Sequence, residues 1–350
     1  MFQIRELPCV RVPASEAEHV IRALKARGLY ADGYKAKRLA DGVVAIPLNE
    51  RVTPEVLREF SSDYRVVECL ERFEGGVGGL TFKDLLKGLI PENDLKRVPS
   101  SYTIIGDVAV INLPEDLMTY GGLIGEAIVS VSRGVRAVYA GSQVVGEYRV
   151  KRLRHVYGDA VSKTVHKEYG LSISVDVVKT YYNSSLSEEH RRVAELINDG
   201  EVVGDLFCGV GPFSLHAASL RRVVSYAVDF NPDALKCLLE SIDMNRKVLK
   251  GRVVPVLDDV ADFLGLIKDR SFSRIVMNLP HKALEYLPLS YSKVQEGGVI
   301  HLYIISSSGG EAVEGVREVS NPLGLSVVGV KRVLDYAPRK YIYRVDVVRG

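Results

Sequence analysis

The chain has 350 residues, and 46 lysines and arginines against 44 aspartates and glutamates give a formal net charge of only +2. Hydrophobic residues make up 47% and charged residues 26%, proportions typical of a folded globular protein, which excludes an intrinsically disordered chain. The longest stretch without Asp, Glu, Lys or Arg, residues 206–220, is too short to cross a bilayer, so we expect no membrane helix.

The N-terminal sequence and the cysteines bear on the cellular compartment. Residues 1–12 lack the basic start, apolar run and small-residue cleavage site of a secretory signal, and we therefore expect a cytoplasmic protein. The cysteines form no CxxC pair, which fits neither a zinc knuckle nor a disulfide framework. We expect all four to be buried thiols: Cys9, Cys69, Cys208 and Cys237.

The length suggests two or three domains, and residues 1–72 are expected to form a small α+β domain. The segment CVRVPA alternates like a strand, and Ser15 and Glu18 then suggest a capping box at the start of a helix over 15–27. The glycine cluster that follows has no periodicity. We predict that residues 73–80 form a flexible linker.

Residues 81–185 are expected to form a second, middle α+β domain. A strand is predicted at 104–114, an apolar helix near 121–132, and further β-rich sequence follows, for example at 172–180. This unit carries no regular alternation of strands and helices.

From residue 186 to the end, short β-branched runs alternate with helical segments, which predicts a parallel, doubly wound sheet. The expected strands are 202–208, 223–228, 253–257, 274–277 and 299–305. The last two strand-like stretches, 325–334 and 341–348, are separated only by a turn. We predict that they form an antiparallel hairpin at the edge of the sheet.

The strongest local signal is the sequence DLFCGVGPFS, which starts at Asp205 between a strand and a helix. Its glycines allow a tight turn and the close approach of a nucleotide-like cofactor beyond the strand ends. The third glycine of the dinucleotide fingerprint is replaced by Ser214, which argues against NAD. A tight turn without a ligand is the alternative. The candidate cofactor residues are Asp205, Phe207, Gly209, Gly211 and Pro212.

Polar residues also follow the next strands. Asp229 could accept hydrogen bonds from both hydroxyls of a ribose. It is available for a ligand because Asn231, directly before a proline, is the better helix cap. Asp259 could accept a hydrogen bond from an adenine amino group, although one acid of the Asp258–Asp259 pair could simply cap a helix. Asn278, in a rigid proline turn, could present a donor and an acceptor to a base edge; an Asn turn is the alternative.

The motifs DLFCGVGPF, VDFNP, LDD and MNLP resemble class I S-adenosylmethionine-dependent methyltransferases with a Rossmann-like domain. In detail the chain resembles the archaeal and eukaryotic tRNA (guanine-N1)-methyltransferases that modify position 37. The segments GEYRVKR, TVHKEYG and VDVVKTYYNSSLSEEHRR are similar to the middle of that family. CVRVPASEAEHVIRAL resembles its N-terminal domain and KRVLDYAPRKYIYRVDV its C-terminal hairpin. The resemblance covers nearly the whole chain and implies S-adenosylmethionine as cofactor and tRNA as partner.

The resemblance also implies roles for three residues. Arg149 falls where the family places an arginine at the guanine O6, Glu189 where it places a carboxylate near N1, and Asn278 on its target-base amide. The chemistry requires such groups, because N1 of guanine carries a proton and negative charge grows on O6. The residues alone leave two alternatives open: Glu189 on a solvated helix face, and Arg149 in a phosphate-binding cluster.

Two positions depart from the family, which often has arginine where Ser185 and His190 stand. We expect His190 either to donate a hydrogen bond to an RNA phosphate or to orient Glu189; a surface helix histidine is the alternative. No metal site is expected, because His155, His166 and His190 are widely dispersed in the sequence.

Two segments are strongly basic although the whole chain is nearly neutral. Residues 144–167 hold six basic and two acidic residues, a net charge of +4 typical of a backbone-binding patch. Residues 331–350 also carry +4, with tyrosines that could stack on bases. A strand pair with solvated charges is the alternative for this tail. The candidate RNA contacts are Lys151, Arg152, Arg154, Lys163, Lys167, His190 and Arg339.

The first hypothesis is therefore a monomeric methyltransferase that binds the anticodon loop and outer body of tRNA. The alternatives are a wybutosine-pathway aminocarboxypropyl transferase, a non-catalytic RNA-binding protein, and a nicotinamide-dependent dehydrogenase. The N-terminal resemblance and the MNLP motif argue against the aminocarboxypropyl transferase. The intact cofactor motifs argue against a non-catalytic RNA-binding protein. The missing third glycine and the basic segments argue against the dehydrogenase.

Overall fold

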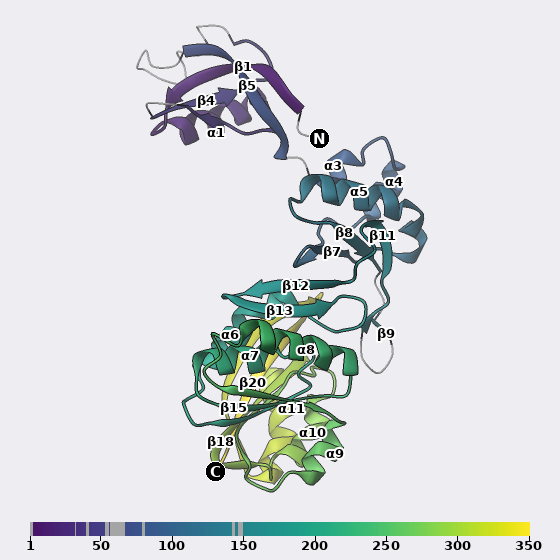
Figure 1. Cartoon of the computed structure of the whole chain (residues 1–350), viewed down its shortest axis with the longest axis vertical. Helices are drawn as coiled ribbons and strands as arrows, with labels where there is room; N and C mark the ends of the chain where they lie inside the picture. The colour runs from purple at the N-terminus through teal and green to yellow at the C-terminus, as the bar shows by residue number, and fades with distance from the viewer. Residues whose placement is uncertain are drawn as a thin grey trace. The chain divides into compact units, whose positions relative to one another are not determined.

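The computed structural model of the chain describes residues 3–31, 33–39, 42–52, 56, 67–78, 81–141, 144–145 and 150–350. They form two compact units (Figure 1). The first takes its residues from 1–100, 113–138 and 156–158, and the second from 101–112, 139–155 and 159–350. The middle of the sequence thus contributes to both units, so the three consecutive domains remain an expectation. No helix of the described chain is long and apolar enough to span a membrane.

The first unit begins with a five-stranded sheet in the order β2-β5-β1-β4-β3 and helix α1. Alternate residues of β1, such as Val10 and Val12, pack with Val20 and Leu24 of α1 in one apolar cluster. The expected helix is confirmed, but the capping box is not: Glu16 is the N-cap residue and makes no side-chain capping hydrogen bond. The elements are β1 (Gln3–Pro13), α1 (Ala17–Ala26), β2 (Gly33–Tyr34), β3 (Lys37–Arg38), β4 (Val43–Pro47) and β5 (Val67–Gly78).

Strand β5 changes two expectations. It continues to Gly78 and pairs with β1 as far as Gly75 opposite Gln3, so residues 73–78 are strand rather than linker; residues 79–80 lie outside the described residues. The two strands also place Cys9 directly opposite Cys69, and these cysteines form a disulfide. The expectation of four thiols is therefore wrong for this pair. It is confirmed for the other two cysteines, Cys208 and Cys237, which are free and buried.

The central part of the chain combines short helices with small sheets. The expected strand at 104–114 is instead two strands, β6 and β7, that turn at Gly106, whose φ is +58°. They belong to a four-stranded sheet in the order β11-β8-β7-β6. The elements are α3 (Phe82–Leu85), α4 (Glu92–Arg97), β6 (Thr103–Ile105), β7 (Val108–Ile111), η2 (Glu115–Tyr120), α5 (Gly121–Val131), β8 (Ala137–Ala140), β9 (Val144–Val145), β10 (Val150–Lys151), β11 (Arg154–Gly158), β12 (Lys163–Glu168) and β13 (Leu171–Asp176).

The rest of the chain forms the predicted doubly wound sheet, in the order β16-β15-β14-β17-β18-β20-β19. The first five strands in this order are parallel, and β19 and β20 form the predicted antiparallel hairpin. The elements are η3 (Ser184–Leu186), α6 (Ser187–Glu195), β14 (Val202–Leu206), α7 (Pro212–Leu220), β15 (Val224–Asp229), α8 (Pro232–Asn245), β16 (Arg252–Leu257), α9 (Val260–Leu266), β17 (Phe272–Met277), α10 (Ala283–Ser290), β18 (Val294–Ser306), α11 (Gly309–Ser320), η4 (Asn321–Leu323), β19 (Leu325–Ala337) and β20 (Lys340–Arg349).

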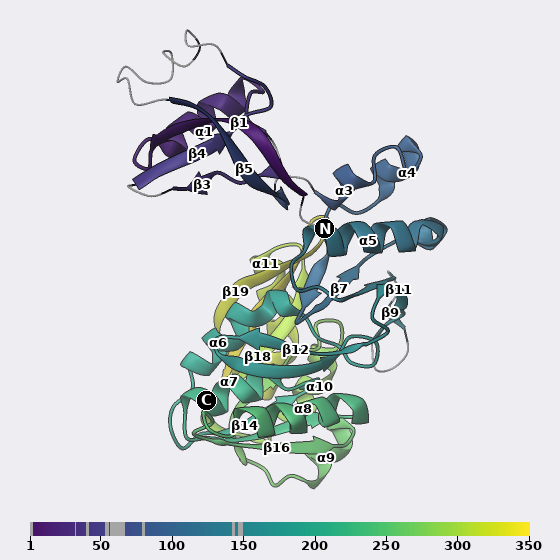
Figure 2. The ribbon, with the colours of Figure 1, turned by 45° about the horizontal axis from the view of Figure 1, so that its top comes forward.

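Helices cover both faces of this sheet because successive strand residues point to opposite sides. In β17, Ile275 and Met277 join the apolar cluster formed with α9, α10 and α11. Val276, between them, joins a second cluster with Val193 of α6 and Phe213 of α7. Figures 1 and 2 show α6 and α7 together, away from α9 and α10. The sheet is thus buried on both faces, as expected for parallel strands.

Candidate active site

The register of the parallel strands brings the predicted motifs to one edge of the sheet. Leu206 in β14 lies opposite both Val228 in β15 and Met277 in β17. Asp229, at the end of β15, lies opposite Leu257 in β16. The segments that leave these strands therefore start side by side, on either side of the point where the strand order reverses, which is where open α/β sheets bind ligands.

The glycine loop between β14 and α7 is held in a left-handed backbone conformation. Phe207, Gly209 and Gly211 have φ values of +80°, +55° and +77°. The N–H groups of Phe207 and Cys208 both donate to the Val228 carbonyl, at 3.0 and 2.9 Å. At two of these positions only glycine adopts the conformation without strain, so the backbone stays open for a ligand.

Asp229 lies beside this loop, where the sequence predicted it. Its Oδ2 accepts from the Gly209 N–H at 2.7 Å and its Oδ1 from the Asn231 N–H at 2.9 Å. Burial raises the pKa of Asp229, although these hydrogen bonds oppose the rise. Asn231 is confirmed as the cap of α8, because its Oδ1 accepts from the N–H of Asp233 at 3.0 Å and of Ala234 at 3.4 Å. Asp229 thus orders the loop and keeps acceptor capacity for a ribose.

Asp205 supports the same loop from inside the protein. The residue is 1% exposed, and its Oδ2 accepts from the N–H and the hydroxyl of Ser214 in α7, at 3.2 and 2.7 Å. Its Oδ1 is buried and has no hydrogen-bond partner among the described residues. Burial raises the pKa of Asp205 to about 7. Direct contact of this carboxyl with a cofactor stays a prediction.

The polar side chains at the other two strand ends differ in whether the protein already uses them in hydrogen bonds. Asp259 is the N-cap of α9, with Oδ1 accepting from the Ala261 N–H at 2.7 Å, so the capping alternative holds for this acid. Asn278 follows β17 and is half-buried. The described part of the chain offers its amide no hydrogen-bond partner, which leaves it free for a ligand. Adenine binding by Asp259 stays a prediction.

Glu189 lies in α6 and is 3% exposed, so a solvated helix face is the wrong alternative. Its Oε1 accepts from the Tyr303 hydroxyl at 2.9 Å and from Arg344 at 2.7 Å. Its Oε2 accepts from Arg192 at the longer distance of 3.3 Å. Burial and the neighbouring Glu189 raise the pKa of Tyr303 well above its usual value, so this hydroxyl remains a donor. Glu189 is a fixed, buried carboxylate.

Tyr303 and Arg344 were not predicted from the sequence as part of the site. They lie directly opposite each other on β18 and β20, as do His301 and Asp346. Arg344 also pairs with Asp346 at 2.9 Å, and Asp346 with His301 at 2.6 Å. The only sequence signal was a charged pair at alternate positions of an otherwise apolar strand, which indicates an inward-facing polar side.

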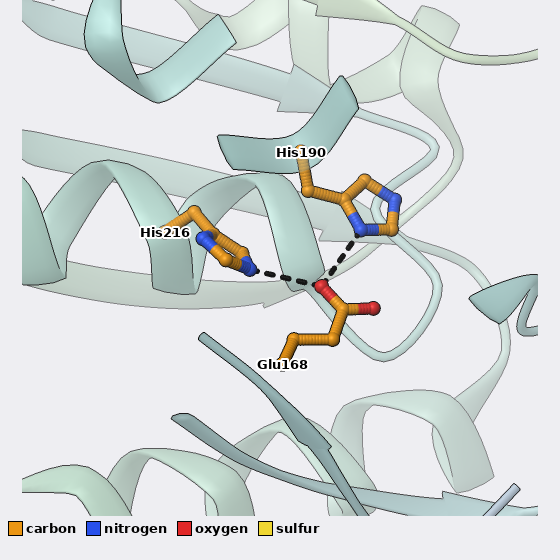
Figure 3. A group of neighbouring side chains, drawn as sticks. All are labelled: Glu168, His190 and His216. Atoms are coloured by element: carbon orange, nitrogen blue, oxygen red, sulfur yellow. Dashed lines mark hydrogen bonds and ion pairs between the residues drawn. The ribbon is translucent and has the colours of Figure 1, made fainter. Parts of the chain in front are cut away.

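His190 does not lie where an RNA phosphate could reach it. The residue is 2% exposed, and its Nδ1 lies 3.0 Å from the Glu168 carboxylate (Figure 3). The predicted contact with an RNA phosphate and the alternative of a surface histidine are therefore both wrong. Dispersal in the sequence was also a poor guide, because His190 and His216 meet at Glu168. The other departure from the family, Ser185, is exposed in η3.

The basic residues of the expected RNA patch are in different situations. Arg149 lies outside the described residues, and for Lys151 the structure describes only the backbone, in β10. Arg152 and Arg154 are exposed, whereas Lys163 forms an ion pair with Glu240. Of the remaining two residues, Lys167 donates a hydrogen bond to Ser172. Arg339 is exposed in the β19–β20 turn, where its φ is +58°. RNA binding by these residues stays a prediction.

Three protein-family models match consecutive parts of the chain. Residues 164–328 match the TRM5/TYW2 methyltransferase domain, 82–161 the TYW2 N-terminal domain, and 9–56 the tRNA methyltransferase 5 N-terminal domain. The first match contains the glycine loop, Asp229, Asn278 and Glu189.

Individual proteins match over most or all of the chain. The tRNA (guanine(37)-N(1))-methyltransferase Trm5b of Pyrococcus abyssi is 36% identical over 344 residues, 96% of this chain and 97% of that protein. Its crystal structure has a TM-score of 0.70, over 98% of this chain and 99% of that one. The solved complex of aTrm5 and tRNALeu has a TM-score of 0.72 at 26% identity, with the same coverage. The tRNA 4-demethylwyosine(37)-methyltransferase Taw21 of Saccharolobus solfataricus is 31% identical, over 76% of this chain and 98% of that protein.

Proposed function

The chain belongs to the TRM5/TYW2 methyltransferase family, and we propose that it transfers a methyl group from S-adenosylmethionine to N1 of guanine 37 in tRNA. The observation that carries this proposal is the full-length match to a tRNA (guanine(37)-N(1))-methyltransferase, which includes the N-terminal domain. The strand-end residues expected for such an enzyme meet at one edge of the sheet, which supports the same conclusion.

S-adenosylmethionine fits the residues at this edge. A side chain at Gly211 would overlap Leu238, and Gly209 also has a left-handed φ, so the loop offers bare backbone to a ligand. Asp229 would accept hydrogen bonds from the ribose hydroxyls. The Asn278 amide has no hydrogen-bond partner in the described structure, and it would contact the cofactor or the target base. When bound, S-adenosylmethionine supplies an electrophilic methyl group. The candidate cofactor contacts also include Phe207, Pro212 and Asp259.

Glu189 would take the proton from guanine N1 as the N1–methyl bond forms. Arg344 and Tyr303 donate to its Oε1, which fixes the position of the side chain. Its Oε2, which has only a long contact with Arg192, keeps capacity for the new proton. Arg149 would stabilise the charge that develops on O6, and Asn278 would orient the base.

We further propose that the protein acts as a cytoplasmic monomer in which residues 1–72 contact the outer body of the tRNA. The exposed Arg152, Arg154 and Arg339 would neutralise phosphates near the anticodon loop, so affinity would fall with salt. Lys163 would have to leave its ion pair with Glu240 to do the same. Guanine 37 would have to leave its stack to reach the site.

The test is methyl transfer to a tRNA transcript with G37, comparing Glu189→Gln with Glu188→Gln. Glu188 is the matched control, because it is the preceding acid of the same helix and its side chain is 73% exposed. We expect kcat to fall by about 10²- to 10⁴-fold in Glu189→Gln, as for loss of a general base, and to stay within about 3-fold in Glu188→Gln, as for an exposed position. Equal rates in the two variants would remove Glu189 from the mechanism.

A second candidate is methylation of 4-demethylwyosine at position 37, the activity named for the Taw21 relative. That relative matches only 76% of this chain, whereas the guanine-N1 enzyme matches 96%. A tRNA carrying 4-demethylwyosine in place of G37, assayed in parallel, distinguishes the two. A product with an aminocarboxypropyl group would instead support the wybutosine-pathway alternative.

A further inference from the structure

The buried residues Glu168, His190 and His216 form a cluster that the methyl transfer does not use, and Figure 3 shows both imidazoles directed at the same carboxylate. Glu168 is the last residue of β12, His190 lies in α6 and His216 in α7. The side chains of Glu168 and His216 are 0% exposed, and that of His190 is 2% exposed. Three separate elements of the second unit therefore converge on one point.

No lysine or arginine of the described chain pairs with the carboxylate of Glu168. Oε2 of Glu168 contacts His190 Nδ1 at 3.0 Å and His216 Nε2 at 2.9 Å, and Oε1 accepts from the Tyr182 hydroxyl. Neither imidazole carries a fixed charge, since a histidine is neutral or charged according to its protonation. Buried carboxylates are normally paired with a cation or bound to a metal.

The hydrogen bonds also leave the cluster incomplete. Nδ1 of His216 is buried and has no hydrogen-bond partner among the described residues. The contact with Glu168 is therefore the one polar contact that the described structure gives this imidazole. A metal bound at Nε2 would leave Nδ1 as the protonated nitrogen of this ring, so Nδ1 is not itself a ligand.

Two imidazole nitrogens and one carboxylate oxygen are a donor set that zinc uses in proteins. The candidate ligand atoms all lie within 4.8 Å of one another. With zinc–ligand bonds of about 2.0–2.1 Å, tetrahedral ligand atoms lie about 3.3 Å apart. The two nitrogen–oxygen separations of 3.0 and 2.9 Å need to change by only a few tenths of an ångström, and the two nitrogens, which lie within 4.8 Å of each other, must also come to about 3.3 Å by rotation of the imidazoles. Tyr182 contacts the other carboxylate oxygen, as outer partners of metal-bound carboxylates do.

We propose that Glu168, His190 and His216 bind a divalent transition-metal ion, with Zn²⁺ the ion that their donor set favours. Nδ1 of His190 and Nε2 of His216 bind through their lone pairs, so each neutral ring carries its proton on the other nitrogen. The ion has a structural role: it joins β12 to α6, which carries Glu189, and to α7, which follows the glycine loop. This site is independent of the proposed function.

The first arm of the test uses wild-type protein without an affinity tag. The full chain is stripped with a chelator and titrated with ZnCl₂ by calorimetry and with CoCl₂ by visible absorption, and thermal unfolding is followed with and without Zn²⁺. We expect one ion per chain, the d–d bands of Co²⁺ bound by nitrogen and oxygen ligands, and a Tm that rises with Zn²⁺ concentration. Failure of stripped wild-type protein to take up Zn²⁺ or Co²⁺ would overturn the proposal and leave a proton-bearing hydrogen-bond cluster.

The second arm uses His190→Gln, His216→Gln and Tyr182→Phe, with His155→Gln as control, because His155 is exposed and outside the cluster. Each cluster histidine variant should lose the Co²⁺ bands, Tyr182→Phe should bind about 10- to 100-fold more weakly, and the control should bind like wild type. Unchanged uptake in both cluster histidine variants would place the ion elsewhere and overturn the proposal. Circular dichroism checks folding; if those variants do not fold, Tyr182→Phe and the wild-type titration decide.

Discussion

Gly211→Ala is the substitution whose cost follows most directly from the geometry of the glycine loop. Gly211 has φ +77°, and an added Cβ would meet Cδ2 and Cγ of Leu238 at 3.0 and 3.2 Å, with Cδ1 closer still. The left-handed backbone costs a residue with a Cβ about 1–2 kcal/mol, and overpacking a buried site costs about 1–3 kcal/mol. We therefore expect the free energy of unfolding to fall by about 2–5 kcal/mol.

The measurement is urea unfolding of Gly211→Ala beside Gly315→Ala. Gly315 lies in α11, has an ordinary φ and has nothing within 4 Å of an added Cβ, so alanine there should be neutral or stabilising by up to about 1 kcal/mol. The variant at Gly211 should also bind S-adenosylmethionine more weakly, because the loop must shift. A loss below about 0.5 kcal/mol, the range of ordinary surface changes, would refute the claim that this turn requires glycine.

Four other variants test buried polar groups of the methyltransferase domain. Because the folded-state pKa of Asp205, about 7, lies above the usual value of 3.8 for this side chain, the stability it contributes is present below about pH 4 and is lost as the pH rises to 7. Wild-type protein should therefore lose about 3 kcal/mol relative to Asp205→Asn between pH 5 and 8, measured by urea unfolding; parallel pH profiles would contradict this. Arg344→Met removes the closer of the two arginines that pair with the buried Glu189 and should cost about 3–5 kcal/mol, against about 1–2 kcal/mol for Tyr303→Phe; equal losses would show that the ion pair with Arg344 does not matter. Asn231→Ala removes the cap of α8 and should cost about 1–2 kcal/mol, and an unchanged urea midpoint would contradict the capping role.

Features that depend on a single continuous segment, or on the general geometry of a parallel sheet, could be predicted from the sequence. The five parallel strands and the hairpin follow from β-branched runs, and the cap at Asn231 from the proline after it. The gathering of Gly209, Asp229 and Asn278 follows from a general property of parallel sheets, whose carboxyl ends share one edge. These local signals suffice because each is decided by a few neighbouring residues.

Features that depend on one particular pairing of two distant segments, rather than on the general geometry of a parallel sheet, could not be predicted. The β1–β5 pairing decides both the Cys9–Cys69 disulfide and the strand conformation of the glycine cluster, and no local pattern reveals that register. Likewise Arg344 reaches Glu189 only because β20 pairs with β18 beside α6. Tertiary contacts override local propensity in such cases, as they do for most strands.

Methylation at N1 of guanine 37 is tested by product analysis of methyl transfer to matched tRNA transcripts. Transcripts with G37 or A37 are incubated with methyl-labelled S-adenosylmethionine and digested to nucleosides. We expect 1-methylguanosine from the G37 transcript and no labelled nucleoside from the A37 transcript. Label in any other nucleoside, or equal labelling of both transcripts, would contradict N1 methylation of guanine 37.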